Sequence, residues 1–389
     1  MDDDGPTRRR VLAGSAVALG AGLAGCLGDD GAGGAGGDSD TLPDIPRVED
    51  PPDGVYVPTH REAMEHLPTV EAGEYALTPM ITYPHRFWLV TGQQTEEVLP
   101  ESREGVHLMF TPWDPETGQV LAVDAGAEMR VYHDSEEVDR RAPWPMISQT
   151  MGFHFGDNVP LPADGTYSVE VELNPITTER SGAFADRFEE SATATFEFEY
   201  DESFRRNLVD NVEYLDEENW GRRGALEPMH GMGDHDDHDH DHDHDHDHDH
   251  DDDHDDDHDH DHTMPVSQLP PADAYPGTIL GEPQTGDATV VAGYLEDSRF
   301  GDGYLFVSPR TPHNRVPLAD MALSVEGAVD GRLEQVLDDE LGLHYGIEAS
   351  LEPGDTIEIV VDAPPQVSRH TGYETAFLEM PSVEITVPE

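Results

Sequence analysis

The sequence predicts an all-β protein with two immunoglobulin-like β-sandwich domains, joined by a short helix and a disordered Asp/His-rich linker. Two observations predict this fold. Short runs rich in Val, Thr, Phe and Tyr recur between clusters of Pro, Gly and Asp, and the pattern of the first half returns in the second. Alternation of apolar and polar residues with frequent turn signals is typical of antiparallel sandwiches.

The expected strands follow one another along each half. In the first half we expect strands at 75–82, 86–91, 106–110, 127–133, 166–173 and 193–200, and in the second at 288–294, 304–307, 322–326, 356–361 and 382–387. After the first set, Phe204, Leu208, Val212 and Leu215 fall at helical spacing behind Ser203, a suitable N-cap. A short helix therefore ends the first domain.

An internal repeat relates the two halves. The segment Phe153-His154-Phe155-Gly156 matches Leu343-His344-Tyr345-Gly346 at an offset of 190 residues. The segment 107–112 matches 304–309 at an offset of 197 residues. Two sandwiches of one ancestry explain this duplication.

The composition is extremely acidic. The chain of 389 residues has 84 Asp and Glu against 21 basic residues, all of them Arg, for a net charge of −63. Molar salt shortens the Debye length to about 3 Å and screens such repulsion, so the composition is typical of a halophilic protein. No basic face is available for nucleic acid. The single Cys excludes a disulfide framework and CxxC metal sites.

The N-terminus has the pattern of an export signal. Three Arg at 8–10 precede an apolar run at 11–24, which is too short for a comfortable membrane span of roughly 20 residues. The Arg cluster resembles a twin-arginine (Tat) signal, and Leu-Ala-Gly before Cys26 resembles a lipobox. We expect lipidation of Cys26 and anchoring to the outer face of the cell membrane; a signal anchor with a chance Cys is the alternative. Residues 28–40 would be a flexible tether.

Between the two halves lies a tract of 17 Asp and 12 His, residues 234–262. It has no apolar side chain to bury and is expected to be disordered. Removing its Asp leaves the rest of the chain at −46. Imidazoles among carboxylates favour loading with divalent metal ions, whereas a solvated spacer would need no His. The expected ligands are His235, His238, His240, His242, His244, His246, His248, His250, His254, His258, His260 and His262.

These features give a domain map. We expect a signal with lipobox at 1–26, a tether at 27–50, sandwich domain 1 at 51–202, a helix and linker at 203–233, the tract at 234–262, and sandwich domain 2 at 263–389.

Enzymatic signatures are absent. The sequence has no G-x-S-x-G elbow, P-loop, G-x-G-x-x-G or H-E-x-x-H motif, so we expect no enzyme and no catalytic residue. The stretch His60 to His66 spaces its two His by six, which does not place them on one helix face, and it reads as a surface helix turn.

Met and His gather in the first half in a way that favours a soft or borderline metal such as copper. His107 lies in an expected strand, while Met146, Met151 and His154 lie in the loop or strand edge 145–158. Each of these alone is more often a packing residue.

The stretch from Met146 to Tyr167 resembles the bacterial periplasmic iron-transport family, which includes exported metal-binding lipoproteins. The carriers of this resemblance are a Met, a His-Phe-Gly-x-Asn segment, then Leu-Pro, Gly and Thr-Tyr, with an upstream Val-His-Leu strand. The resemblance implies His107, His154 and one of Met146 or Met151 as ligands. The Met spacing departs from the family pattern, since Met146 and Met151 precede His154 by eight and three residues.

The remaining family element, Pro-Pro followed by Arg-His-Thr, occurs only in the second half and contributes His370. The second half also has His344, but Tyr304 stands where the first half has His107. Three alternatives stay open: other residues such as His85 or nearby carboxylates complete one site, the two domains share a site, or only the fold remains.

The resulting expectation is an exported, lipid-anchored protein that captures a divalent cation (iron, copper or zinc) for a membrane uptake system. The membrane, a metal permease and a second copy of the chain are the expected partners. The alternative is a structural or interaction lipoprotein whose Asp/His tract is only a spacer.

Overall fold

Strand alternation builds a sandwich in the first half of the chain. The computed structural model describes residues 43, 45–229, 265 and 267–389. Two sheets face each other across a core to which β7 contributes Val106, Leu108 and Phe110, and β12 contributes Val169 and Val171. The larger sheet runs β2 (Glu65–His66), β4 (Tyr75–Thr82), β7 (Glu104–Trp113), β11 (Gly152–Pro160), β10 (Trp144–Ser148), β24 (Ser368–Arg369), β5 (Phe87–Thr91) and β6 (Gln94–Val98), with β3 (Val70–Ala72) beside β4. The smaller sheet runs β14 (Ala192–Tyr200), β12 (Gly165–Leu173), β8 (Glu128–His133) and β9 (Glu136–Arg141).

The second half forms one sheet whose two layers are joined through β21, which pairs with both β22 and β20. Its strands are β16 (Thr278–Gly281), β18 (Ala288–Leu295), β19 (Tyr304–Arg310), β22 (Gly342–Glu348), β21 (Gly331–Asp338), β20 (Ala322–Gly327), β23 (Thr356–Ala363) and β25 (Val383–Thr386), with β13 (Glu179–Arg180) and β17 (Gln284–Thr285) at its sides. The short elements are β1 (His60–Arg61), β15 (Glu213–Tyr214), α1 (Glu202–Asp210), η1 (Gly182–Phe184), η2 (Glu217–Asn219), η3 (Ala272–Ala274) and η4 (Ser298–Phe300).

The all-β prediction is confirmed, and every expected strand coincides with a strand of the structure. The predicted helix exists, but its N-cap is Asp201, whose side chain accepts a hydrogen bond from the Phe204 backbone N–H, and not Ser203. A carboxylate at this position also interacts favourably with the helix dipole.

One local interpretation is wrong, and the structure decides between the two alternatives of another. The stretch 60–66 is not a surface helix turn, because His60–Arg61 and Glu65–His66 are strands and His60 is buried. The segment 145–158, expected to be a loop or a strand edge, is largely strand, because Met146 and His154 face each other in the β10–β11 hairpin. The strand at 60–61 pairs with β15, far away in sequence, and the strands within 145–158 are joined by a tight turn. Hydrophobic periodicity shows neither the distant partner nor the turn.

The repeat is visible in the strand register. Met109 on β7 pairs with Gly156 on β11, and the equivalent Phe306 on β19 pairs with Gly346 on β22. The isolated bridges Trp113–Val120 and Arg310–Pro317 repeat at the same offset of 197 residues. The two halves therefore share the register of these strands.

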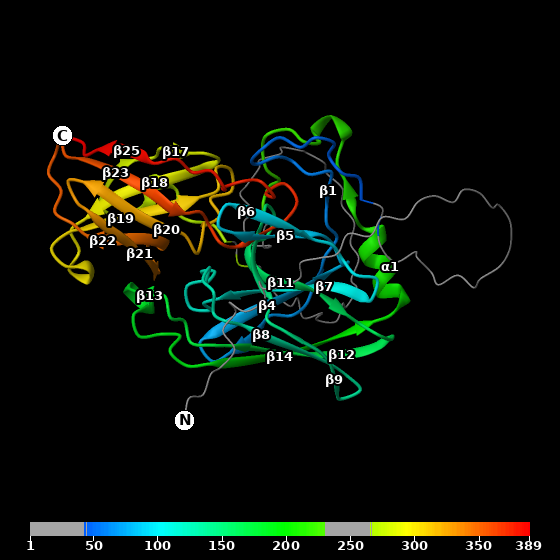
Figure 1. Cartoon of the computed structure of the whole chain (residues 1–389). Helices are drawn as coiled ribbons and strands as arrows, with labels where there is room; N and C mark the ends of the chain where they lie inside the picture. Colours follow the sequence, from blue (N-terminus) through cyan, green and yellow to red (C-terminus); the bar gives the residue numbers. More distant parts are fainter. Residues whose placement is uncertain (1–42, 44, 230–264, 266) are drawn as a thin grey trace, which may run out of the picture. The chain divides into compact units, whose positions relative to one another are not determined.

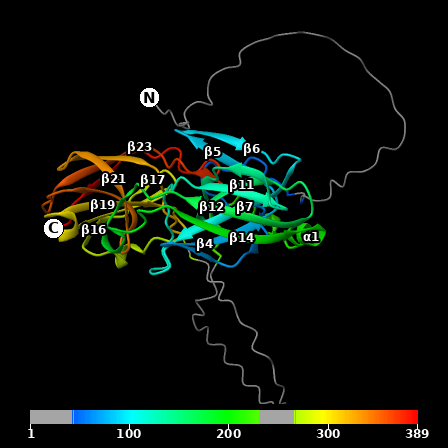
Figure 2. The same cartoon turned by 90° about the horizontal axis from the view of Figure 1, so that it is seen from below.

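Each half also lends a two-residue strand to the other. β13 of the first half runs parallel to β21, with Glu179 opposite Val336, and β24 of the second half runs parallel to β10, with Ser368 opposite Met146. Figure 1 shows green β13 beside β21 of the second half, and Figure 2 shows the red C-terminal segment reaching β5. This exchange places residues of both halves at one sheet.

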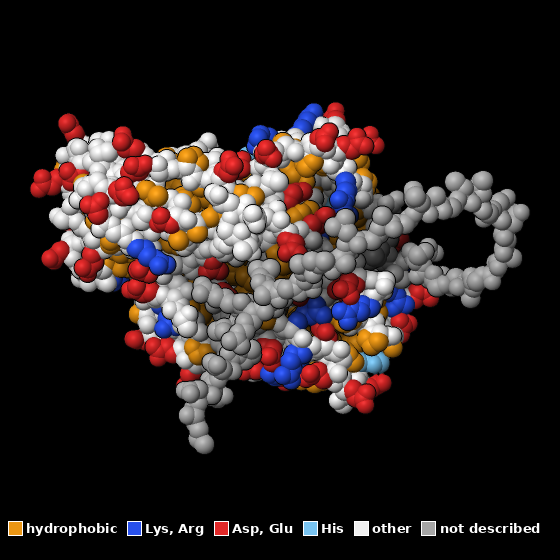
Figure 3. Space-filling view, in the orientation of Figure 1, with side chains coloured by type: hydrophobic (Ala, Val, Ile, Leu, Met, Phe, Trp, Pro, Cys, Tyr) orange, Lys and Arg blue, Asp and Glu red, His pale blue; other side chains and the backbone are white. Residues whose placement is uncertain are grey.

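Carboxylates are spread over the surface in Figure 3, with fewer Arg side chains among them. Within the described ranges, no helix has the length and apolar character needed to cross a membrane. The predicted export signal, Cys26 and the tract histidines lie outside the described residues.

Candidate metal centre

The candidate centre lies on the outer face of the larger sheet. Along β7, Val106 and Leu108 point into the sandwich core, so the intervening His107 points to the opposite face. Along β11, Phe153 and Phe155 point into the core and His154 points outward in the same way. His107 and His154 lie on the outer face of this sheet, yet each is 0% exposed.

The C-terminal half supplies a third imidazole. Ser368 and Arg369 pair with Met146 and Ile147, and the backbone N–H of the next residue, His370, donates to the Ile147 carbonyl over 3.2 Å. This pairing fixes His370 beside the β10–β11 hairpin. Nε2 of His370 lies 3.0 Å from Nε2 of His154.

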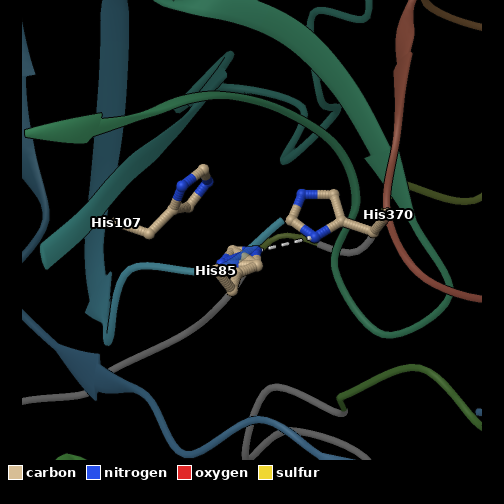
Figure 4. Close-up of side chains that lie close together, drawn as sticks. All are labelled: His85, His107 and His370. Atoms are coloured by element: carbon tan, nitrogen blue, oxygen red, sulfur yellow. Dashed lines mark hydrogen bonds between the residues drawn. The ribbon is translucent and has the colours of Figure 1, made fainter. Parts of the chain in front are cut away.

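His85 completes the group from the turn after β4. Its backbone N–H donates to Oδ1 of Asn158 over 3.2 Å, and Nδ2 of Asn158 donates to its carbonyl over 2.9 Å. Nε2 of His85 then lies 3.2 Å from Nδ1 of His370. One ring nitrogen from each of His85, His107 and His370 lies within 4.8 Å of the other two. Figure 4 shows these three side chains close together.

The hydrogen bonds determine which ring nitrogens carry protons. Nδ2 of Asn158 donates to a carbonyl, so its Oδ1 is an acceptor and Nδ1–H of His107 donates to it over 2.9 Å. Nδ1–H of His154 donates to the Gly152 carbonyl over 3.1 Å. In neutral rings this leaves Nε2 of His107 and Nε2 of His154 as lone pairs.

The same reasoning extends to the other two rings. Because Nε2 of His154 has no proton, Nε2–H of His370 donates to it, and Nε2–H of His85 donates to Nδ1 of His370. Two buried lone pairs then remain without a hydrogen-bond partner, on Nε2 of His107 and Nδ1 of His85. Unsatisfied buried acceptors cost about 1–3 kcal/mol each, which a Lewis-acidic metal ion would relieve.

Burial keeps these rings neutral. It lowers the pKa of His85 to about 3 and that of His154 to about 4, and it holds the pKa of His107 and His370 well below the ordinary value. Neighbouring histidines add to the shift at His107 and His370. Protons therefore do not compete for the lone pairs at neutral pH.

One carboxylate borders the imidazoles. Oε1 of Glu62 lies 3.4 Å from Nε2 of His85, and burial raises the pKa of Glu62. Nearby, Nε2 of His60 lies 2.9 Å from the Tyr83 hydroxyl. Two cavities beside this group share His60, Glu62 and Thr371 in their walls; one of them is also lined by His85 and the other by His370. Both cavities therefore place polar side chains next to the imidazoles.

A thioether approaches the same place. On β11, a Cβ built on Gly156 would lie 2.8 Å from Nε2 of His107 and 3.3 Å from Sδ of Met146. The missing side chain therefore gives room for the imidazole and the sulfur on one face.

Comparisons with known proteins identify no family for the whole chain. Residues 273–386 match a domain of unknown function, DUF7350. Two solved structures of FetP from uropathogenic Escherichia coli strain F11 are similar to part of the chain. One is a copper-bound variant at 18% identity and a TM-score of 0.28, covering 35% of this chain and 97% of that one. The other, FetP as isolated, has 18% identity and a TM-score of 0.25, covering 35% and 96%. No curated protein matches the chain.

The structure brings together most of the residues that the sequence singled out. His107, His154, Met146 and His370 meet, with His85 from the alternative of a completed site, and the two halves contribute jointly. His344 lies elsewhere, on β22, where its Nε2 is 3.1 Å from the Tyr304 hydroxyl. Met151 packs in a separate group of methionines.

Sequence reasoning missed two residues of the centre's surroundings. Glu62 was assigned to a surface turn, although its place between two histidines was a usable signal. Asn158 was noted only as part of a motif, and its contacts with two histidines depend on strand register.

Proposed function

We propose that this chain captures a copper ion outside the cytoplasm and passes it to a membrane permease. The ion would bind at the four-histidine centre, formed by His85, His107, His154 and His370. The observation that carries the proposal is the pair of buried, unpartnered ring nitrogens on His107 and His85, beside the His154–His370 contact. Packing alone gives no reason to bury four imidazoles with two orphaned lone pairs.

Ligand chemistry favours copper among the divalent candidates. Neutral imidazoles with a thioether at Met146 suit copper, and zinc follows in affinity. Iron prefers more oxygen ligands than the single carboxylate of Glu62 near the rings provides. No covalent step is required, so the proposal assigns binding and delivery to the chain, not catalysis.

The proposed location at the cell membrane rests on the signal-like pattern at the N-terminus. A lipid on Cys26 would hold the chain on the outer face of the cell membrane, and the histidine tract would collect ions around it. The permease, the lipid anchor and the export route are parts of this proposal.

The test is metal binding by a full-length chain in which the twelve tract histidines are replaced by Ser, here named the tract-serine chain. Titration with Cu(II) and Co(II) in molar salt should give one tight ion per chain, with absorption bands of nitrogen ligation. His107→Ala and His154→Ala should each weaken binding at least a hundredfold. The matched control is His313→Ala, at an exposed position. No tight ion in the tract-serine chain would overturn the proposal and favour the structural module.

A further inference from the structure

Beside the histidines, on the same outer face, lies a cluster whose hydrophobic members are all methionines. Met80, Met109 and Met151 are buried in it, and Met64 and Met229 pack against them. These are five of the 12 methionines in the chain. We name this group the methionine cluster.

Strand register explains how the cluster forms. Met80 on β4 pairs with Met109 on β7, and Met109 pairs with Gly156 on β11. Directly paired residues share a face, so both side chains lie on the side opposite the sandwich core. Met151 comes from the turn between β10 and β11.

Packing alone does not account for this composition. The main core combines Val, Leu, Ile, Phe, Tyr and Ala with scattered methionines such as Met129. In the methionine cluster no branched aliphatic or aromatic residue is a member. Burying a Met side chain costs about 1.5–2 kcal/mol of rotamer entropy, against about 0.5–1 for Leu or Ile. A purely apolar patch would be filled at lower cost by Leu.

We propose that the methionine cluster is a second metal site, selective for a soft monovalent cation such as Cu(I). Thioethers are neutral, polarisable ligands that select Cu(I) and bind hard divalent ions weakly. A single positive charge is also cheaper to bury among neutral ligands than a double one. The site does not rest on the four-histidine centre, because it shares no ligand with it.

The two sites are adjacent. His107 and Met109 are two residues apart on β7 and project from the same face. A Cβ on Gly156 would lie 3.0 Å from Cγ of Met109 and 2.8 Å from Nε2 of His107. One glycine therefore separates a nitrogen-rich site from a sulfur-rich site.

The experiment uses the tract-serine chain with Ag(I), a redox-inert soft cation, in molar sodium sulfate, since chloride would precipitate silver. We expect one Ag(I) per chain, with at least two sulfur neighbours by X-ray absorption. Met80→Leu with Met109→Leu should weaken Ag(I) binding at least tenfold while the protein stays folded, because Met to Leu conserves volume. Met129→Leu, in the main core, is the matched control and should change nothing.

Variants of the four-histidine centre distinguish the two proposed metal sites. His107→Ala should abolish Co(II) binding and leave Ag(I) binding in place, and the double Met variant should do the reverse. Ag(I) with nitrogen neighbours only, or with the single sulfur of Met146, would overturn the second site. If the tract-serine chain with all four histidines intact binds Ag(I) but not Co(II), the copper-capture proposal is contradicted and the methionine cluster stands.

Discussion

At the scale of single residues, Asn158 organises the centre without being an expected ligand. Its amide accepts from His107 and holds both backbone polar groups of His85. It therefore sets the tautomer of one ring and the position of another. Partners of this kind commonly change metal affinity by about 10–100-fold.

We predict that Asn158→Leu weakens Co(II) binding by about 10–100-fold, because His107 loses the acceptor that keeps its proton on Nδ1. Asn158→Asp should restore part of the affinity, since a carboxylate accepts the same bond. Titration of the tract-serine variants measures this. Equal affinities for the Leu and Asp variants would contradict a positioning role, because packing alone would not separate them.

A second residue-scale prediction concerns Asp320, at a positive φ of 54°. Burial and nearby Asp124 raise its pKa to about 6 from 3.8. The folded state therefore disfavours the charged carboxylate, and this penalty appears as the pH rises from about 4 through 6. Asp320→Asn should stabilise the protein by about 1 kcal/mol at pH 7 and little at pH 4.

Thermal unfolding in molar salt at the two pH values checks this prediction. Asn tolerates a positive φ, so the backbone is not strained by the change. Asp362→Asn, at an exposed site, is the control. A gain in melting temperature that is equal at pH 4 and pH 7 would exclude the carboxylate charge as its cause.

At the scale of elements, β24 determines whether the centre exists. Its Arg369 is fully buried, donates to the carbonyls of Val367 and Pro365, and lies over the Phe377 ring. Burial lowers its pKa to about 9. The side chain ties together the segment that carries His370.

We predict that Arg369→Met lowers the free energy of unfolding by about 2 kcal/mol, since two buried carbonyls lose their donor. It should also weaken metal binding, because His370 is the next residue. Denaturant titration and Co(II) binding measure both effects, with exposed Arg332→Met as the control. Unchanged Co(II) affinity would show that β24 holds His370 without Arg369.

At the scale of the whole molecule, the two related halves have one histidine centre between them within the described residues. In the second half the position of His107 is taken by Tyr304, whose hydroxyl donates to Nε2 of His344. The two exchanged strands also differ in the residue that follows them. His370 follows β24, whereas Ser181 follows β13 and donates a hydrogen bond to Asp338. In the second half, the lone pair of His344 and a carboxylate oxygen of Asp338, which could ligate an ion, therefore accept hydrogen bonds instead.

We therefore predict one divalent ion per tract-serine chain, not two, and no change in this stoichiometry in His344→Ala. Elemental analysis after gel filtration measures the ratio. A drop in stoichiometry in His344→Ala would show that the second half binds an ion of its own.

The sequence predicted more of the fold than of the metal centre. Every expected strand was found because its apolar face follows the period of two, which packing enforces locally. β24 was missed as a strand, since two residues carry too little pattern, and the stretch 145–158 was left open between a loop and a strand edge, where the structure has β10 and β11.

Alternation, offset and residue type are properties of the chain order, so the all-β class, the duplication and most histidines of the centre could be predicted from the sequence. That His370 of the second half joins His85, His107 and His154, and that His344 does not, emerged from the folded structure alone. The physical reason is strand exchange: a pairing between residues 146 and 368 depends on backbone hydrogen bonds across the fold, which no local pattern records.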